Sequence, residues 1–171
     1  MPRSLGERIT RTLLKEALPR AWIFKPAYKA GQLLRPLLSP ALQDKLRKTP
    51  PAGRWPQRAH ARKMLVLDGC VQPAMAPNIN AATARVLDAF GVQLVAAPGG
   101  PFCGAMRYHL NDHDGGLDDM RRNIDAWWPV VEQVEAIVMT ASGCGVTVKE
   151  YGHLLAHDAA YAAKAQSISA M

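Results

Sequence analysis

Hydrophobic residues recur at helical spacing from the start of the chain and are interrupted by prolines. The first stretch carries apolar side chains on one face and basic side chains on the other: Leu5, Ile9, Leu13 and Leu14 against Arg8, Arg11 and Lys15. This pattern predicts an amphipathic helix that ends near Pro19. A second helix is predicted over 21–38, bent or broken at Pro26 and Pro36 because proline removes a helix hydrogen bond. A short helix over 41–47 follows.

From residue 64 onward, short apolar runs alternate with longer helical stretches. The apolar runs at 64–68, 92–96 and 136–140 predict three buried strands. Helices are predicted between and after these strands, over 78–90, 116–133, 146–156 and 159–167. Strands that alternate with helices along a chain usually pair in parallel through crossover connections. The pattern therefore predicts a small Rossmann-like, doubly wound α/β domain whose parallel sheet has three or four strands.

Charge divides the chain into two parts. Residues 1–63 contain 15 Lys and Arg against 3 acidic residues, whereas residues 64–171 contain 6 against 11, so the net charge of +7 is carried by the first part. Prolines also concentrate there, and the segment from residue 49 reads as an extended linker. The sequence thus predicts a basic helical arm over 1–48, a proline-rich linker over 49–63 and a cysteine-containing α/β domain over 64–171.

Length and composition exclude several classes. With 171 residues, 49% of them hydrophobic, the chain supports one core of ordinary size. It contains neither an apolar run of the ~18 residues needed to span a bilayer nor the apolar core of a secretory signal. Three cysteines cannot form a disulfide scaffold. We therefore expect a cytoplasmic location, where thiols stay reduced.

Four interpretations of the basic arm are considered, each of which gives it a different role. Its helices pack on another domain or subunit with their charges solvated, which we favour, or they lie on an anionic membrane surface. Nucleic-acid binding is not expected, because the basic residues are dispersed and no base-reading motif accompanies them. A mitochondrial presequence would be richer in Ser and would lack Glu7 and Glu16. We expect the domain to leave much of the arm's apolar face uncovered.

Each of the three cysteines lies just past the carboxyl end of a predicted strand. Cys70 follows the first strand, Cys103 the second and Cys144 the third, and each has a glycine beside it. In open parallel sheets, ligands bind at this edge, and glycine allows the backbone to approach them closely. The alternative is three small buried hydrophobic residues. We favour a thiolate site, with the sulfurs within roughly 10 Å of one another.

The sequence motifs around the three cysteines exclude several kinds of site. No C-x-x-C motif is present, so a thioredoxin-type site is excluded, and no G-x-G-x-x-G follows the first strand, so NAD binding is not expected. His109 lies six residues after Cys103, which permits a Cys–His nucleophilic pair without being diagnostic of one. Gathered soft thiolates suit an iron–sulfur cluster or zinc.

Long motifs in the domain carry a family resemblance. They include Gly-Cys-Val-Gln-Pro at 69–73 and Thr-Ala-Ser-Gly-Cys-Gly at 140–145, together with 78–88, 108–111, 123–129 and 148–153. These segments resemble the iron–sulfur subunits of glycolate oxidase, and the arm is similar at 2–18 and 33–38. The resemblance covers nearly all of 64–165 and corresponds to the first cysteine-rich domain of the "CCG" type in that family.

The resemblance implies an oxidoreductase component rather than a chain that catalyses alone. The family belongs to membrane-associated complexes that oxidise glycolate to glyoxylate. Flavin-containing partner subunits take the hydride, and the iron–sulfur subunit passes electrons on through 4Fe-4S clusters. No flavin is expected in this chain, and the implied location is peripheral, at the inner face of the cell membrane. The family's ferredoxin-like domain and second cysteine-rich domain have no counterpart in this sequence.

Cys70, Cys103 and Cys144 match cysteine positions of the family and are the implied metal ligands. The family has a further cysteine where this chain has Phe102. A cluster usually takes four protein ligands, so His109, water or a partner's residue would supply the fourth. Zinc and an empty, degenerate site stay open as alternatives. In the last case the chain is a non-catalytic assembly module, and Phe102 fills part of the volume that a cluster would use.

Overall fold

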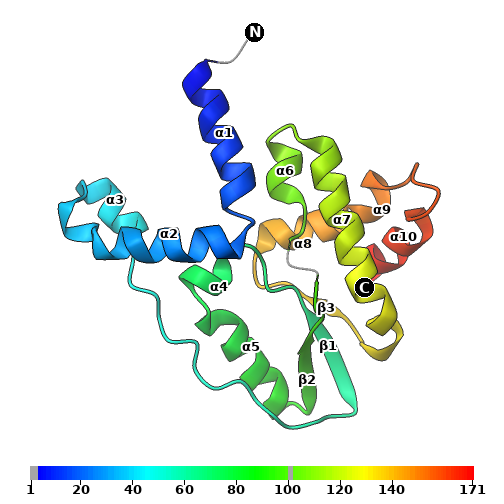
Figure 1. Ribbon diagram of the computed structural model, residues 1–171. Helices are drawn as coiled ribbons and strands as arrows, with labels where there is room; N and C mark the ends of the chain where they lie inside the picture. The colour runs from blue at the N-terminus through cyan, green and yellow to red at the C-terminus, as the bar shows by residue number, and fades with distance from the viewer. Residues whose placement is uncertain (1–3, 100–101) are drawn as a thin grey trace.

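The computed structural model describes residues 4–99 and 102–171, and a three-stranded parallel sheet lies at its centre (Figure 1). The strands are β1 (Arg62–Val66), β2 (Val92–Ala96) and β3 (Ile137–Val138). Their order is β2-β1-β3, and β1 pairs in parallel with both neighbours. The predicted parallel α/β sheet is therefore confirmed.

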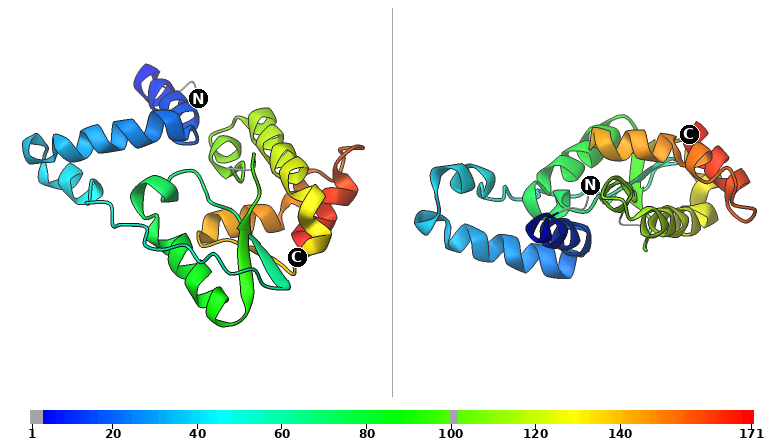
Figure 2. Two further views of the ribbon diagram at one scale, coloured as in Figure 1. Left: turned by 60° about the horizontal axis from the view of Figure 1, so that its bottom comes forward. Right: turned by 90° about the horizontal axis from the view of Figure 1, so that it is seen from above.

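Helices cover both faces of this sheet (Figures 1 and 2). One face carries α5 (Asn78–Ala89), and the other carries α7 (His113–Trp127), α8 (Ser142–Lys149), α9 (Tyr151–Leu154) and α10 (Ala162–Ala170). Successive residues of a strand point to opposite faces. Accordingly, Leu65 belongs to the larger core on the α7 side, while Val66 packs with Ala84 of α5. The arrangement is doubly wound, as predicted.

The larger core is closed by aromatic and aliphatic side chains of α7 and α9. Trp127 and Tyr151 are fully buried, and their rings stack with centroids 6.5 Å apart. Ile124 lies about one helical turn before Trp127 and Met120 about two turns before it, and both are equally buried. This side of the sheet therefore holds most of the apolar burial of the domain.

Several element bounds differ from the prediction. The helix expected over 116–133 ends at Trp127 and continues as the 3-10 helix η2 (Trp128–Gln133), because Pro129 has no N–H to extend the α-helical ladder. The helix α8 begins at Ser142, where a glycine-rich loop was expected. Two short helices were not predicted: α4 (Gln72–Met75) and α6 (Ala105–His109).

The arm consists of α1 (Leu5–Ala17), α2 (Ala21–Leu33), the 3-10 helix η1 (Arg35–Leu37) and α3 (Pro40–Lys45). It projects from the rest of the molecule (Figure 2). Pro26 lies inside α2 without ending it, so the predicted break occurs only before η1. None of the described helices is both long enough and apolar enough to cross a bilayer.

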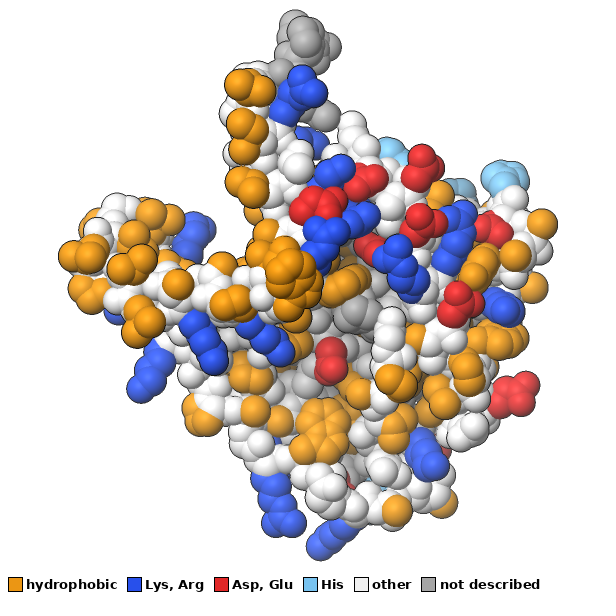
Figure 3. All heavy atoms as spheres, in the orientation of Figure 1, with side chains coloured by type: hydrophobic (Ala, Val, Ile, Leu, Met, Phe, Trp, Pro, Cys, Tyr) orange, Lys and Arg blue, Asp and Glu red, His pale blue; other side chains and the backbone are white. Residues whose placement is uncertain are grey.

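Most of the apolar face of the arm is exposed, as predicted, and it forms orange strips in Figure 3. Six of its large side chains are between 51% and 83% exposed: Leu5, Ile9, Leu13, Trp22, Leu33 and Leu37. The arm meets the domain mainly at the end of α1 and the start of α2. There Lys15 Nζ lies 3.1 Å from Asp112 Oδ2, and Glu16 pairs with Arg107.

Candidate functional site: a cysteine pocket

Three segments at the carboxyl ends of the strands bring three cysteines to one pocket. Cys70 lies between β1 and α4, Cys103 lies between β2 and α6, and Cys144 lies in the first turn of α8, just after β3. Because all three strands are parallel, these segments emerge at the same edge of the sheet. The structure thus places the three predicted site residues together.

The sulfurs of Cys103 and Cys144 are in direct contact. Their Sγ atoms are 3.4 Å apart and share a hydrogen bond, and all three cysteines are free thiols. This separation is well beyond the ~2.05 Å of a disulfide bond. Cys70 lines the same cavity, which has a volume of about 200 Å³. Cys103 is buried, whereas Cys70 and Cys144 are half-buried.

The contact between these two thiols shifts their pKa values in opposite directions. The hydrogen bond from Cys144 stabilises the thiolate of Cys103 and lowers the pKa of Cys103 to about 7, against the opposing effect of burial. The same contact raises the pKa of Cys144, and burial adds to that rise. Burial, followed by the nearby charge of Cys103, also raises the pKa of Cys70. The pocket therefore favours one thiolate, on Cys103, when nothing else is bound.

A buried polar pair holds the Cys103 segment from behind. The Asn123 side-chain amide donates to the carbonyl of Phe102 and, over 2.9 Å, to the Tyr151 hydroxyl. The Tyr151 hydroxyl in turn donates to the carbonyl of Cys103 over 3.0 Å. Both Asn123 and Tyr151 are fully buried, so these bonds are shielded from water. The segment that carries Cys103 is thus fixed by the core of the domain.

A second polar cluster ties together the segments that carry Cys70 and Cys144. The Gln72 amide donates to Asn80 Oδ1 over 2.8 Å and to Thr140 Oγ1 over 2.6 Å. Thr140 Oγ1 also donates to Asn80 Oδ1 over 2.7 Å, and the Asn80 amide reaches the Asp68 carboxylate at 3.2 Å. These bonds join residues just before Cys144 to residues on either side of Cys70. They fix the relative position of the two segments.

The arm contributes to the wall of the pocket. Pro19, in the turn between α1 and α2, is buried and lines the cavity beside the cysteines. Asp119 lines it from α7 and pairs with Arg122 at 2.6 Å and with Arg107 at 3.6 Å. Burial raises the pKa of Asp119, and the two arginines counteract this rise. The charged cluster near Arg107 lies at the junction of α1 with α6 and α7 (Figure 3).

The sequence did not single out these supporting residues. Asn123 had one detectable signal: it occupies a position of the buried stripe of α7 that otherwise holds Met120, Ile124 and Trp127, and a polar residue on such a stripe demands a buried partner. Pro19 and Asp119 gave no comparable signal. Their place in the site depends on contacts between segments far apart in the chain.

Phe102 and His109 were also predicted to lie at the site, and the structure places only Phe102 there. Phe102 lines the pocket beside Cys103, in line with the expectation that it occupies part of this space. His109 is exposed at the end of α6 and is not among the residues that line the pocket. The structure therefore does not bring His109 to the cysteines.

The three thiols of the pocket are ligands of the kind that binds an iron–sulfur cluster. A cluster usually takes four protein ligands, so one is missing from this pocket. Two thiolates on one tetrahedral zinc would be about 3.8 Å apart, farther than the 3.4 Å of Cys103 and Cys144. Among the described residues, no group of three or more His, Cys, Asp or Glu is placed to hold a metal ion. In a 4Fe-4S cluster, each thiolate ligand is bound to a different iron atom. Cluster binding would therefore require the sulfurs of Cys103 and Cys144 to separate.

The fold and the pocket together define a cysteine-lined α/β domain with its site at the carboxyl edge of a parallel sheet. The cysteine-rich domain family, CCG, matches residues 64–149, half of the chain, and the chain belongs to this family. The match contains all three cysteines of the pocket, together with β2, β3 and the last three residues of β1. No solved structure matches the chain.

Similar proteins are found among oxidoreductase subunits. The chain is 48% identical over 169 residues to the glycolate oxidase iron-sulfur subunit of Escherichia coli, an alignment that covers 98% of the chain and 42% of that protein. It is 30% identical to the probable glycolate oxidase iron-sulfur subunit of Bacillus subtilis, over 61% of the chain and 23% of that protein. It is 29% identical to lactate utilization protein A of Bacillus velezensis, over 58% of the chain and 40% of that protein. The chain thus spans less than half the length of each.

Proposed function

We propose that this chain is an iron–sulfur electron-transfer component of a complex that oxidises glycolate to glyoxylate. The observation that carries the proposal is the convergence of Cys70, Cys103 and Cys144 on one pocket. The 48% identity to the glycolate oxidase iron-sulfur subunit supports the choice of glycolate. A bound iron–sulfur cluster, of the 4Fe-4S type or a related one, supplies one-electron transfer.

The residues of this chain would hold such a cluster in a defined place. The thiolate of Cys103 is available near neutral pH, because its pKa is lowered to about 7. Asn123 and Tyr151 fix the backbone on either side of this thiolate. Phe102, Met106 and Pro19 give the pocket apolar walls that limit the entry of water. The chain itself carries no catalytic residue in this proposal, so substrate oxidation takes place on a partner.

The proposed partners are flavin-containing subunits of the same complex. The exposed apolar face of the arm is the part of the described surface best suited to contact them, since such patches mark interaction sites. The proposed location is cytoplasmic and peripheral, at the inner face of the cell membrane. The basic side chains of α1, including Arg8 and Arg11, favour an anionic surface there.

Anaerobic reconstitution with ferrous iron and sulfide tests the proposal. The readouts are iron and acid-labile sulfide per chain, together with visible charge-transfer absorption. We expect the natural chain to bind iron in less than full amount, and Cys103→Ser to abolish binding. His109→Gln should change nothing, because His109 lies outside the pocket. Absence of iron from every variant, including the one described next, would overturn the proposal.

Phe102→Cys is the informative gain-of-ligand variant. It supplies a fourth thiolate beside Cys103 and removes a bulky side chain from the pocket. We expect it to raise iron per chain and the charge-transfer absorption above those of the natural chain. Equal and nearly stoichiometric iron in both chains would show that three thiols form a competent site, and that Phe102 is no obstacle.

A second candidate is a non-catalytic assembly module, and Phe102 favours it because a fourth thiol is missing from the pocket. In this case the arm and the domain hold partner subunits together without passing electrons. The two candidates differ in one measurement. An assembly module carrying Cys103→Ser would still support full glycolate oxidation when combined with its flavin-containing partners, whereas an electron-transfer component would not.

A further inference from the structure

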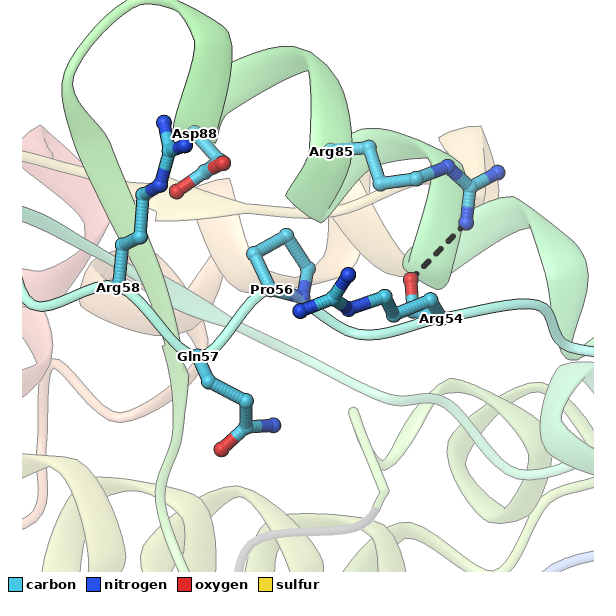
Figure 4. Close-up of a pocket in the computed structure, with 6 residues that line it drawn as sticks. All are labelled: Arg54, Pro56, Gln57, Arg58, Arg85 and Asp88. Carbon is cyan, nitrogen blue, oxygen red and sulfur yellow. Dashed lines mark hydrogen bonds between the residues drawn. The ribbon is translucent and has the colours of Figure 1, made fainter.

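A second concavity lies far from the cysteines, where the linker runs along α5. It is lined by Arg54, Pro56, Gln57, Arg58, Arg85 and Asp88, which we call the arginine pocket, and its volume is about 240 Å³. Figure 4 shows Arg58 of the linker beside Asp88 of α5, and the backbone of Arg54 beside Arg85. Arg85 and Asp88 are three positions apart on α5 and therefore share one face of the helix.

The charges of this pocket are unbalanced. Three arginines line the pocket with a single carboxylate, Asp88, whose Oδ1 already lies 2.7 Å from His60 Nε2. Within the described parts of the chain, none of the ion pairs involves Arg54, Arg58 or Arg85. Like charges held close together repel one another. An anion in the pocket would remove this repulsion.

A backbone carbonyl of the linker holds the side chain of one of these arginines, Arg85. Arg85 Nη1 donates to the carbonyl of Arg54 over 3.1 Å, the dashed line in Figure 4. Gly53 makes this approach possible, because its φ is +79° and a Cβ atom there would lie 2.9 Å from Arg85 Nη1. A guanidinium has five N–H donors. Arg85 therefore keeps donors for a ligand after this contact is made.

We propose that the arginine pocket binds a phosphate group. Guanidinium forks match the oxygens of phosphate in a bidentate manner, which favours arginine over lysine at such sites. The volume is below the ~300 Å³ at which pockets for whole cofactors begin. The pocket thus suits a phosphate or diphosphate, either free in solution or as the headgroup of a phospholipid, rather than a complete nucleotide.

Calorimetric titration of the full chain with pyrophosphate, in a low-salt chloride buffer, tests the soluble source. We expect saturable binding that Arg85→Gln weakens about tenfold or more, since a hydrogen bond to a charged group is lost. Arg58→Gln should weaken it as well. Lys149→Gln is the matched control, because it removes one positive charge from an exposed position of α8 and should leave binding unchanged.

Flotation with vesicles of phosphatidylglycerol, against vesicles of phosphatidylcholine, tests the lipid source. The arm is the same in all variants and contributes equally to each, so the decisive comparison is Arg85→Gln with Lys149→Gln. Phosphatidylglycerol binding that only Arg85→Gln weakens assigns the pocket to a headgroup. The proposal is overturned if Arg85→Gln and Lys149→Gln have equal effects in both assays, or if neither ligand binds.

Discussion

The arm and the α/β domain bury their large hydrophobic residues very differently. In the domain, Trp127 and Tyr151 are fully buried and stack on each other inside one continuous core. In the arm, Trp22 is 76% exposed, and among its residues from Ser4 onward only Pro19 and Tyr28 are buried. The tryptophans have the same chemistry, so the difference comes from what surrounds them. The domain buries most of its large apolar side chains, whereas the arm exposes most of its own to solvent.

This contrast separates two roles within one chain. The domain fixes the cysteine pocket through buried hydrogen bonds from Asn123 and Tyr151, which need a rigid core. The arm reaches the pocket through Pro19 and is held there by surface ion pairs such as Lys15–Asp112. Surface pairs contribute little to stability. We therefore expect the site to depend on the domain for its geometry, and on the arm for one wall.

Replacing the two tryptophans tests the comparison with the largest expected effect. Trp127→Ala should lower the free energy of unfolding by about 3–5 kcal/mol, because it opens a cavity in the core. Trp22→Ala should change it by less than about 0.5 kcal/mol, because Trp22 contacts mainly solvent. Urea denaturation followed by circular dichroism measures both values.

A more conservative substitution keeps the comparison testable if the first variant does not fold. If Trp127→Ala does not fold, Trp127→Phe keeps an aromatic ring next to Tyr151 and should give a smaller loss in the same assay. Equal losses for the substitutions at Trp22 and Trp127 would show that the arm is packed as tightly as the domain. The contrast drawn above would then be wrong.

The Asn123 hydrogen bonds should have an intermediate effect. Asn123→Ala removes the donor to the Phe102 carbonyl and to the Tyr151 hydroxyl, and such buried groups cost about 1–3 kcal/mol when left unpaired. We also expect faster alkylation of Cys103 by iodoacetamide at constant pH, since its segment is no longer fixed. Asn78→Ala is the control, because Asn78 makes no hydrogen bond to Phe102 or Cys103. An unchanged alkylation rate would mean that Tyr151 alone positions the segment.

The strands and the convergence of the cysteines could be predicted because both follow from local pattern. The run at 92–96, preceded by Gly91, gave the bounds of β2 correctly. The run at 136–140 gave too long a strand, because only Ile137 and Val138 pair with β1. Parallel order then placed each cysteine at the same edge. Hydrophobic pattern thus finds strands, whereas pairing decides their length.

The supporting contacts of the site could not be predicted, because they join segments far apart in the chain. The hydrogen bond between Lys15 and Asp112 spans 97 residues, and that between Arg107 and Glu16 spans 91. No local pattern relates such positions. The helical start of α8 was missed for another reason. Gly143 and Gly145 favour a loop by composition, but the Gly145 N–H donates to the Ala141 carbonyl over 3.0 Å and Thr147 Oγ1 donates to the Gly143 carbonyl over 2.9 Å, which closes a helical turn.

The smallest expected effect concerns the junction of arm and domain at low pH. The hydrogen bond from Lys15 lowers the pKa of Asp112 below its ordinary 3.8; burial opposes this shift, and the charges of Lys15 and Arg107 add to it. A carboxylate whose pKa is lowered by folding stabilises the folded state above its ordinary pKa, and this contribution is lost as the pH falls through the lowered value. The junction should therefore be intact at pH 6 and weakened at pH 3. For a pair this exposed we expect about 0.2–1 kcal/mol, or a change of about 1.4- to 5-fold in an equilibrium.

Hydrogen exchange in the last turns of α1 measures this difference. The protection of the natural chain is divided by that of Lys15→Gln at each pH, which cancels the intrinsic pH dependence of exchange. The ratio should be about 1.4 to 5 at pH 6 and smaller at pH 3, and it should approach 1 only as the pH falls through the lowered pKa of Asp112. Lys25→Gln, an exposed position of α2, should give a ratio of 1 throughout. A Lys15 ratio that is the same at both pH values would show that Asp112 does not hold the arm, and that the pairing of Glu16 with Arg107 and the packing of Pro19 keep it in place.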